Sequence, residues 1–209
     1  EPDKGIHIID NRTPSEPKNV GYIELIGNAD LSIRNNMLYA DSYIDLVWFD
    51  ISNPAQPELK GRLENVFENV LPPMENFQFG YDYAMCYLND NKGVIVGWKL
   101  VERTEPVKLN MIVCHDYAYM QNSSSSSNGA SGLNGSMSRF GLYQNYLYTV
   151  INNNMSIFNL SGDKPVKATD DIYIGWNVET IFSYKDNLFM GTPTGMLIYS
   201  VKDPLKPDY

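Results

Sequence analysis

The chain of 209 residues has a formal net charge of -9, with 16 Lys and Arg against 25 Asp and Glu, and 43% of its residues are hydrophobic. The hydrophobic share is enough to build a core, and the lack of clustered cations argues against nucleic acid as a partner. No apolar run approaches the roughly 18 residues that a membrane helix needs, so we expect no membrane span.

The predicted elements are short strands joined by tight turns, because Tyr, Gly, Asn and Pro are abundant and helix formers are scarce. Residues 5–10 (GIHIID) form a first strand, which a turn ending at Pro17 follows. Residues 18–51 then form a unit of four strands, named here A to D, with a two-residue hairpin turn between strands B and C. We expect similar units at residues 58–100, 107–160 and 166–201.

An apolar run that ends in a Pro-containing turn occurs five times, and the terminal prolines are separated by 40, 49, 59 and 42 residues. These spacings bracket those of propeller blades. When the runs are aligned on the prolines, two columns are apolar throughout: Ile6, Leu46, Ile95, Met155 and Met196, and Ile9, Phe49, Trp98, Phe158 and Tyr199. Strands that are apolar on both faces are typical of sheets sandwiched between two neighbours.

The fold class that we predict is all-β: a β-propeller of four-stranded antiparallel blades. Residues 1–209 then form a single domain with about four blades, and residues 5–10 are strand D of a preceding blade. We favour a segment of a larger propeller, because closure removes exposed sheet edges. The alternative is a closed ring of four blades with a spare strand.

The motif GIHIIDNRTPSEP at residues 5–17 and its shorter copy LVWFDISNPAQP at residues 46–57 resemble the repeats of the LVIVD family. The later copies keep the apolar run and the Pro turn but lose the Asp. The resemblance implies a propeller-like domain of the bacterial cell envelope, often in lipoproteins, and it carries no catalytic residue to this chain.

The candidates for catalytic chemistry are few. His7 lies within a strand, where we expect a packed histidine rather than a ligand. His115 stands beside Cys114, but adjacent strand residues point to opposite faces, so the two side chains do not share a proton. For Cys86 and Cys114 we favour free, buried thiols over a disulfide. The sequence predicts no catalytic residue and no cofactor.

Calcium is a further alternative, because Asp30, Asp41, Asp45 and Asp50 bring several hard oxygen ligands into one unit. Their spacing does not match an EF-hand loop. We favour instead a turn role for Asp10 and Asp50, in which the carboxylate accepts backbone hydrogen bonds, as Asn159 and Ser200 would at the matching position.

The extra residues of the second and third units, 66–77 and 121–135, both fall between strands A and B, which places them on one face of a propeller. For the Ser- and Gly-rich residues 121–135 we favour a disordered tether. Aromatic anchors and polar groups near this face are the candidate ligand-binding residues: Asn28, Asp30, Phe67, Phe77, Phe79, Arg139, Trp176, Asn177 and Glu179. Packing between blades is the competing interpretation of the same side chains.

These observations favour a non-enzymatic, extracytoplasmic domain that binds a protein or a glycan through the face that carries the A–B loops. A lipid anchor outside the segment would suit this location. The alternative is a metal-dependent hydrolase or lyase that uses carboxylates of the propeller face.

Overall fold

The computed structural model describes residues 4–67, 93–97, 139–151, 153–175, 178–192 and 194–209. The chain divides into two compact units, of which the first combines Glu1–Glu68 with Asn134–Tyr209 and the second is Asn69–Leu133. Only residues 93–97 of the second unit are described, so the fold given below is that of the first.

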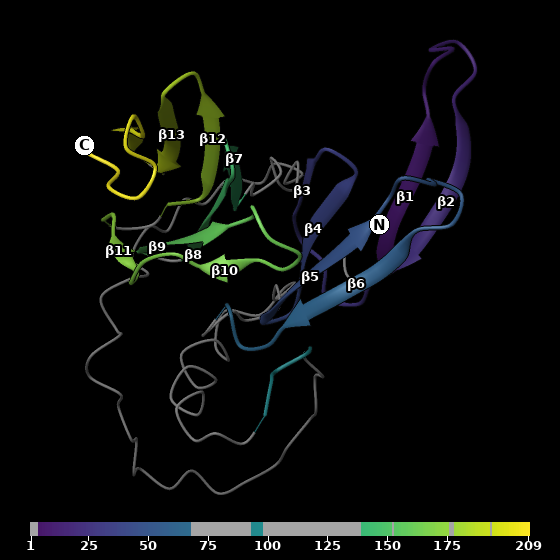
Figure 1. The fold of residues 1–209 in the computed structure, drawn as a ribbon, viewed down its shortest axis with the longest axis horizontal. Coiled ribbons are helices and arrows are strands. Elements are labelled where there is room, and N and C mark those ends of the chain that lie inside the picture. Colours follow the sequence, from purple (N-terminus) through teal and green to yellow (C-terminus); the bar gives the residue numbers. More distant parts are fainter. Residues whose placement is uncertain (1–3, 68–92, 98–138, 152, 176–177, 193) are drawn as a thin grey trace, which may run out of the picture. The chain divides into compact units, whose positions relative to one another are not determined.

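The first unit is built from antiparallel β-sheets, and its described residues contain no helix (Figure 1). No helix of the described chain is therefore long and apolar enough to cross a membrane. The strands are β1 (Gly5–Asp10), β2 (Lys18–Glu24), β3 (Leu31–Arg34), β4 (Met37–Ser42), β5 (Asp45–Asp50), β6 (Glu58–Leu63), β7 (Phe140–Tyr143), β8 (Tyr146–Ile151), β9 (Asn154–Asn159), β10 (Val166–Lys167), β11 (Ile172–Tyr173), β12 (Thr180–Tyr184), β13 (Asn187–Thr192) and β14 (Gly195–Ser200).

Four sheets result from the pairing of these strands. Sheet I is β1-β2, sheet II is β3-β4-β5-β6, sheet III is β7-β8-β9-β10 with β11 also on β9, and sheet IV is β12-β13-β14. An isolated bridge from Ser200 to Asp208 extends sheet IV by one residue pair. The prediction of an all-β chain of antiparallel sheets is confirmed for these residues.

The B–C hairpin turns lie where the sequence places them. Two-residue turns separate β3 from β4, β7 from β8 and β12 from β13, and the first residue of each is left-handed: φ is 53° at Asn35, 51° at Gln144 and 52° at Lys185. Asn tolerates this conformation better than Gln or Lys does. The register repeats as well, because Leu38, Leu147 and Leu188 pair with Phe49, Phe158 and Tyr199.

The Pro-containing turns differ from the prediction in one respect. The sequence places each turn between two units, whereas in the structure the strand after the turn pairs with the strand before it. Asp10 pairs with Lys18, Asp50 with Glu58 and Asn159 with Val166. Sheets II and III therefore run B, C, D and then the following strand A, because the turn returns the chain antiparallel to its own strand D. Sheet I consists of strands D and A alone, and sheet IV of strands B, C and D.

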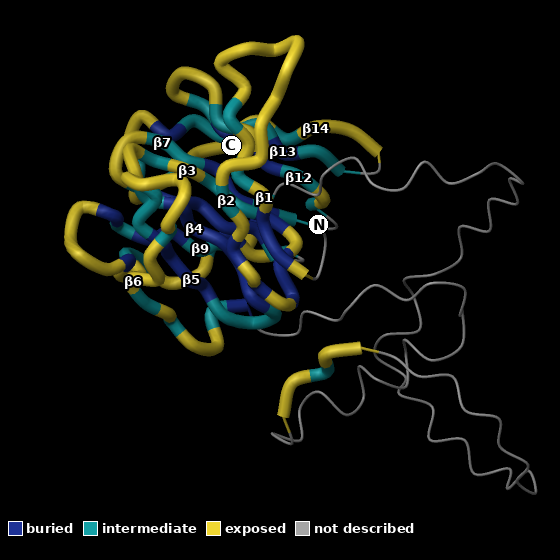
Figure 2. Tube along the Cα trace, turned by 90° about the vertical axis from the view of Figure 1, so that its right-hand side faces the viewer, coloured by how far each residue is buried: buried dark blue, intermediate teal, exposed yellow. Residues whose placement is uncertain are grey.

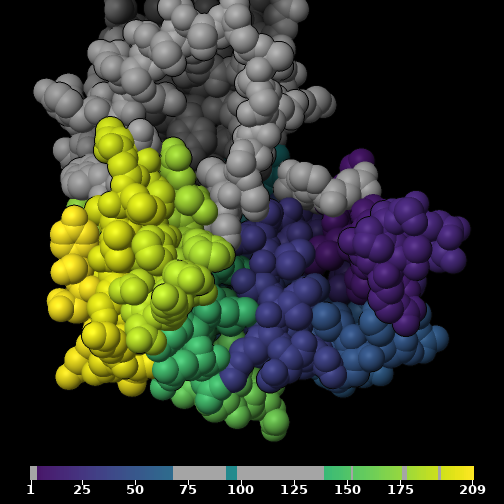
Figure 3. Space-filling view, turned by 90° about the horizontal axis from the view of Figure 1, so that it is seen from above, coloured from purple at the N-terminus to yellow at the C-terminus, as the bar shows by residue number. Residues whose placement is uncertain are grey.

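Successive sheets pack face to face. Ile6 and Ile23 of sheet I share a core with Val47 and Phe49 of sheet II, together with neighbours of the same two sheets. A second core joins sheets III and IV, and its fully buried members include Tyr148, Met155, Ile181, Leu188 and Met190. Sheet II lies beside sheet III, and a hydrogen bond joins them: Ser32 Oγ of β3 donates to the carbonyl oxygen of Phe140 on β7. Figure 3 follows the four sheets from purple through blue and green to yellow.

Side chains of the two apolar columns are buried where another described sheet packs against the face of the sheet on which they lie. Leu46 and Met155 are fully buried, but Met196, which occupies the same column in sheet IV, is 60% exposed. In the other column Phe49 and Phe158 are buried, whereas Ile9 of sheet I is 55% exposed. Figure 2 shows the same contrast between β5, mostly dark blue, and β14, yellow and teal.

Two glycines permit close packing between these strands. A Cβ added to Gly61 would lie 2.4 Å from Cζ2 of Trp48, whose indole covers that position on the paired strand. A Cβ on Gly21, at the equivalent place in β2, would lie 2.2 Å from the carbonyl oxygen of Pro54 in the next sheet's turn. Both positions therefore require a residue without a side chain.

Candidate functional site

A buried polar network occupies the end of sheet II where β3 begins. Asp41 accepts three hydrogen bonds at Oδ1, from the backbone N–H groups of Ala29 and Asp30 and from Nδ2 of Asn28, at 2.8 to 3.0 Å. The Asn28 amide also donates to the carbonyl oxygen of Asp30 at 2.8 Å. All three polar side chains are buried, so the network fixes the entry to β3.

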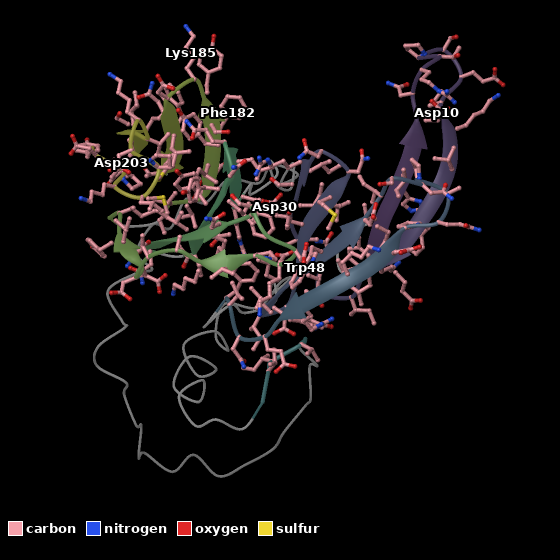
Figure 4. The ribbon with its side chains drawn as sticks, in the orientation of Figure 1. Asp10, Asp30, Trp48, Phe182, Lys185 and Asp203 are labelled. Carbon is pink, nitrogen blue, oxygen red and sulfur yellow. The ribbon has the colours of Figure 1, made fainter. Side chains whose placement is uncertain are left out.

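Asp30 extends this network into the next sheet. Its Oδ1 accepts from the N–H of Leu31 at 2.8 Å, and its Oδ2 accepts from the N–H groups of Arg139 and Phe140 at the start of β7. Figure 4 shows Asp30 between the blue strands of sheet II and the green strands of sheet III. Burial raises the pKa of Asp30, opposed by the three backbone donors, and the charge of Asp41 raises it further. Burial likewise raises the pKa of Asp41.

Asn28, Asp30 and the backbone of Arg139 are thus brought together by hydrogen bonds inside the protein. Asp30 and Arg139 occupy equivalent positions in their sheets, because the N–H of Asp41 donates to the carbonyl oxygen of Asp30 as the N–H of Val150 donates to that of Arg139. The sequence predicted that Asn28 and Asp30 contact a ligand. In the structure both side chains are buried, and their polar groups bond to other groups of the protein.

The remaining predicted residues divide into two groups. Phe67 is buried and contacts Phe140 with ring centroids 5.7 Å apart. It therefore belongs to the core, which agrees with the packing interpretation and not with a role in ligand binding. Glu179 is exposed, and its backbone N–H donates to the carbonyl oxygen of Gly191. Outside the described residues lie Phe77, Phe79, Trp176 and Asn177, together with the insertion at 121–135, Cys86, Cys114 and His115.

The turn role predicted for Asp10 and Asp50 is confirmed. Oδ1 of Asp10 accepts from the N–H of Arg12 at 3.0 Å, and Oδ1 of Asp50 accepts from that of Ser52 at 2.8 Å. Asn159 makes the equivalent bond to Ser161 at 2.8 Å. The Arg12 guanidinium and N–H lower the pKa of Asp10 to about 2.

The candidate calcium ligands are engaged elsewhere. Asp45 bonds to Arg62 at 2.5 Å and accepts from the N–H of Asn65. Within the described ranges no group of three or more His, Cys, Asp or Glu side chains is arranged to hold a metal ion.

His7 differs from the packed histidine that the sequence predicted. It is exposed, because it points away from sheet II on the side of sheet I that no described sheet covers. Its ring lies 4.8 Å from that of Tyr22, and its Nδ1 lies 3.0 Å from Nδ2 of Asn19.

A groove of about 650 Å³ lies between sheets II and III, at the end of the sheets opposite Asp30. Its lining combines the B–C hairpins and strands β4 and β6 with the turn that follows β9: Arg34, Asn35, Met37, Tyr39, Lys60, Asn145, Leu160, Ser161, Gly162 and Asp163. Arg34 Nη2 donates to Oδ1 of Asn145 across the two sheets. Lys60 pairs with Glu58 at 2.8 Å within sheet II.

A second groove of about 430 Å³ lies one sheet further along and is lined by Tyr146, Asn159, Ser161, Gly162, Lys164, Val166, Ala168 and Leu205. Tyr146 holds in sheet III the position that Met37 holds in sheet II, immediately after the hairpin. Leu205, in the Pro turn of sheet IV, corresponds to the turn residues of sheet III in the first groove. The stacking of repeats therefore makes a recess at the equivalent place between both pairs of sheets, although the side chains that line the two recesses differ.

Sequence analysis missed these groove residues, although one signal was present. The B–C hairpins and the Pro turns both follow strands that run in the same direction, so they lie at the same end of each sheet. What the sequence lacks is the spacing between neighbouring sheets, on which the recess depends.

A scan against protein-family models finds no match to this chain, and a search of curated proteins finds no relative of it.

Proposed function

We propose that this chain is part of a β-propeller of LVIVD-like repeats, acting as a non-enzymatic binding domain of the bacterial cell envelope. The four antiparallel sheets support this proposal, because they pack face to face and their apolar columns are buried wherever two sheets meet. Radial stacking of four-stranded sheets is how propellers bury strands on both faces.

The observation that carries the binding role is the repeated groove. It supplies amide, hydroxyl and ammonium groups from Asn35, Asn145, Ser161 and Lys60 beside the apolar surfaces of Met37 and Tyr39. Donors and acceptors spread along a recess, with an aromatic or apolar floor, are what carbohydrate recognition requires. We therefore place the ligand, a glycan of the envelope, at the end of the sheets that carries the Pro turns.

This choice moves the binding face from the A–B loops to the opposite end of the sheets. Asn28 and Asp30 support the move, since their side chains are buried and hydrogen-bonded within the protein. A ligand at that end would have to displace bonds that hold β3 and β7 in place.

The test is titration of the purified chain with a panel of envelope oligosaccharides, followed by isothermal calorimetry on the best binder. Asn145→Ala and Lys60→Ala should each weaken the affinity by about tenfold, because each removes one hydrogen-bonding group. Lys202→Ala, an exposed cation outside the groove, is the matched control.

Equal affinities for the three variants would contradict the location of the site. Retention of an envelope protein by wild type and by both groove variants, without any oligosaccharide binding, would contradict the glycan as ligand.

A further inference from the structure

The Pro turn of sheet III is one residue shorter than the Pro turns of the other sheets. Six residues lie between strand D and the terminal proline at 11–16, 51–56 and 201–206, whereas five lie there at 160–164. Each longer turn has a proline at its fourth position and is closed around it by a backbone hydrogen bond, from Glu16 to Thr13, Gln56 to Asn53 and Lys206 to Asp203. In residues 160–164, all of which are described, no bond of this kind forms.

The longer turns place a proline carbonyl group against the preceding sheet. The carbonyl oxygen of Pro204 accepts a hydrogen bond of 2.8 Å from the phenol of Tyr148 in sheet III. That of Pro54 lies so close to sheet I that a Cβ added to Gly21 would be 2.2 Å from it. The turn of sheet III has no proline at this position, and the groove that it borders measures about 650 Å³, against about 430 Å³ for the second groove.

Tyr39 of β4 has a phenol group without a described acceptor. It holds in sheet II the position that Tyr148 holds in sheet III, since each directly follows the leucine that pairs with a strand D phenylalanine. Tyr39 is only 6% exposed and lines the groove between sheets II and III, and its hydroxyl group forms no hydrogen bond within the described part of the chain. Buried polar groups nearly always have a partner. Burial raises the pKa of Tyr39, so the phenol stays protonated at neutral pH and can donate to a ligand.

Arg34, the last residue of β3, brings a positive charge to the same groove. Its Nη2 donates to Oδ1 of Asn145, a neutral amide, and no described carboxylate forms an ion pair with it. Its charge opposes the rise in the pKa of Tyr39, so the guanidinium lies near the phenol. Lys60 differs, because Glu58 already pairs with its ammonium group at 2.8 Å. Arg34 is therefore the cation of the lining that a ligand can neutralise.

We infer that the groove between sheets II and III selects a glycan that carries a carboxylate, whose oxygen atoms accept hydrogen bonds from the Tyr39 phenol and the Arg34 guanidinium. The carboxylate replaces the proline carbonyl oxygen that the longer turns supply elsewhere. Arg suits this role, because its planar group presents several donors in a geometry that matches a carboxylate. Asp163 of the lining is exposed, where solvent screens its charge. The inference rests on the proposed function, since it specifies the chemical class of the glycan.

Isothermal calorimetry with oligogalacturonate and oligoglucuronate, each compared with its methyl ester, tests the carboxylate. Acid and ester share their hydroxyl groups and differ in charge. At least one acid should bind about tenfold more tightly than its ester, because charge-assisted hydrogen bonds are the stronger ones. Arg34→Gln should remove this preference for the acid. Tyr39→Phe should weaken binding of the acid by about tenfold, because it removes one donor.

Tyr148→Phe is the matched control, because it removes the same hydroxyl group one sheet further along, where Pro204 already accepts its hydrogen bond. It should lower the melting temperature and leave the affinity for the acid unchanged. Tyr39→Phe should have the opposite pair of effects, which separates a binding role from a structural one.

Equal binding of acid and ester overturns the inference, as does an affinity for the acid that neither Tyr39→Phe nor Arg34→Gln changes. If neutral oligosaccharides bind and no acid does, the inference is likewise overturned and the proposed glycan site stands. A chain that binds no oligosaccharide at all contradicts both.

Discussion

The Oδ2 atom of Asp30 accepts a hydrogen bond of 2.9 Å from the backbone N–H of Phe140, 110 residues further along the chain. The bond joins the first residue of β7 to the residue before β3, and so it holds sheets II and III together at one end. Because the carboxylate is buried and also accepts from Leu31 and Arg139, its loss leaves backbone donors without a partner.

Asp30→Asn should lower the free energy of unfolding by about 1–3 kcal/mol, because an amide cannot accept all the bonds that the carboxylate accepts. Urea denaturation followed by fluorescence measures this change. Asp170→Asn, which alters an exposed carboxylate, is the control and should change stability by less than about 0.5 kcal/mol. Equal effects of the two substitutions would show that Asp30 does not join the sheets.

The carboxylates Asp41 and Asp10 should have opposite pH dependences. Burial raises the pKa of Asp41 above its usual 3.8, so the folded state binds the proton more tightly than the unfolded state does. The stability that this provides is complete below 3.8 and is lost as pH rises through the folded pKa. The deficit of Asp41→Asn relative to wild type should therefore grow as pH falls from neutrality towards 4.

Asp10 provides the contrast within the same chain. Arg12 lowers its pKa to about 2, so its contribution is present above 3.8 and is lost as pH falls towards 2. The deficit of Asp10→Asn should then shrink over that interval. Thermal unfolding of the two variants and wild type across pH 2 to 7 measures both trends. If the stability deficits of the two variants changed with pH in the same direction, the opposite pKa shifts of Asp41 and Asp10 would be contradicted.

Gly61→Ala should lower the free energy of unfolding by about 1–3 kcal/mol, because the added methyl group overlaps the indole of Trp48. Gly195→Ala serves as the control, since nothing lies within 4 Å of a Cβ at that position. Chemical denaturation compares them. Combining Gly61→Ala with Trp48→Leu should remove part of the penalty, and full additivity would mean that the two side chains do not meet.

The repeated sequence pattern predicted much of the fold. The apolar columns of sheets II and III, the hairpins at Asn35, Gln144 and Lys185, and the turn roles of Asp10 and Asp50 all follow from local pattern and short-range hydrogen bonding. The strand predicted around Ile95 is wrong for the described residues 93–97, which form no strand. The pairing of each strand A with the preceding strand D did not follow, because periodicity shows that strands recur and not which neighbours they join.

The candidate site was less predictable for a different reason. Asn28 and Asp30 look the same in sequence whether they face a ligand or a backbone amide, and only the position of β7, more than 100 residues away, decides between the two. The exposure of Met196 and Ile9 likewise depends on whether a neighbouring sheet is present, which their own strands do not encode.

Methionine oxidation tests most directly the claim that the inner sheets are covered on both faces and sheet IV on one. Met155 and Met196 occupy the same column, but the first is fully buried and the second is 60% exposed. With hydrogen peroxide, mass spectrometry should find Met196 oxidised as fast as in the unfolded chain and Met155 protected until unfolding. Equal oxidation rates at the two residues in the folded chain would contradict the stacked arrangement of the sheets.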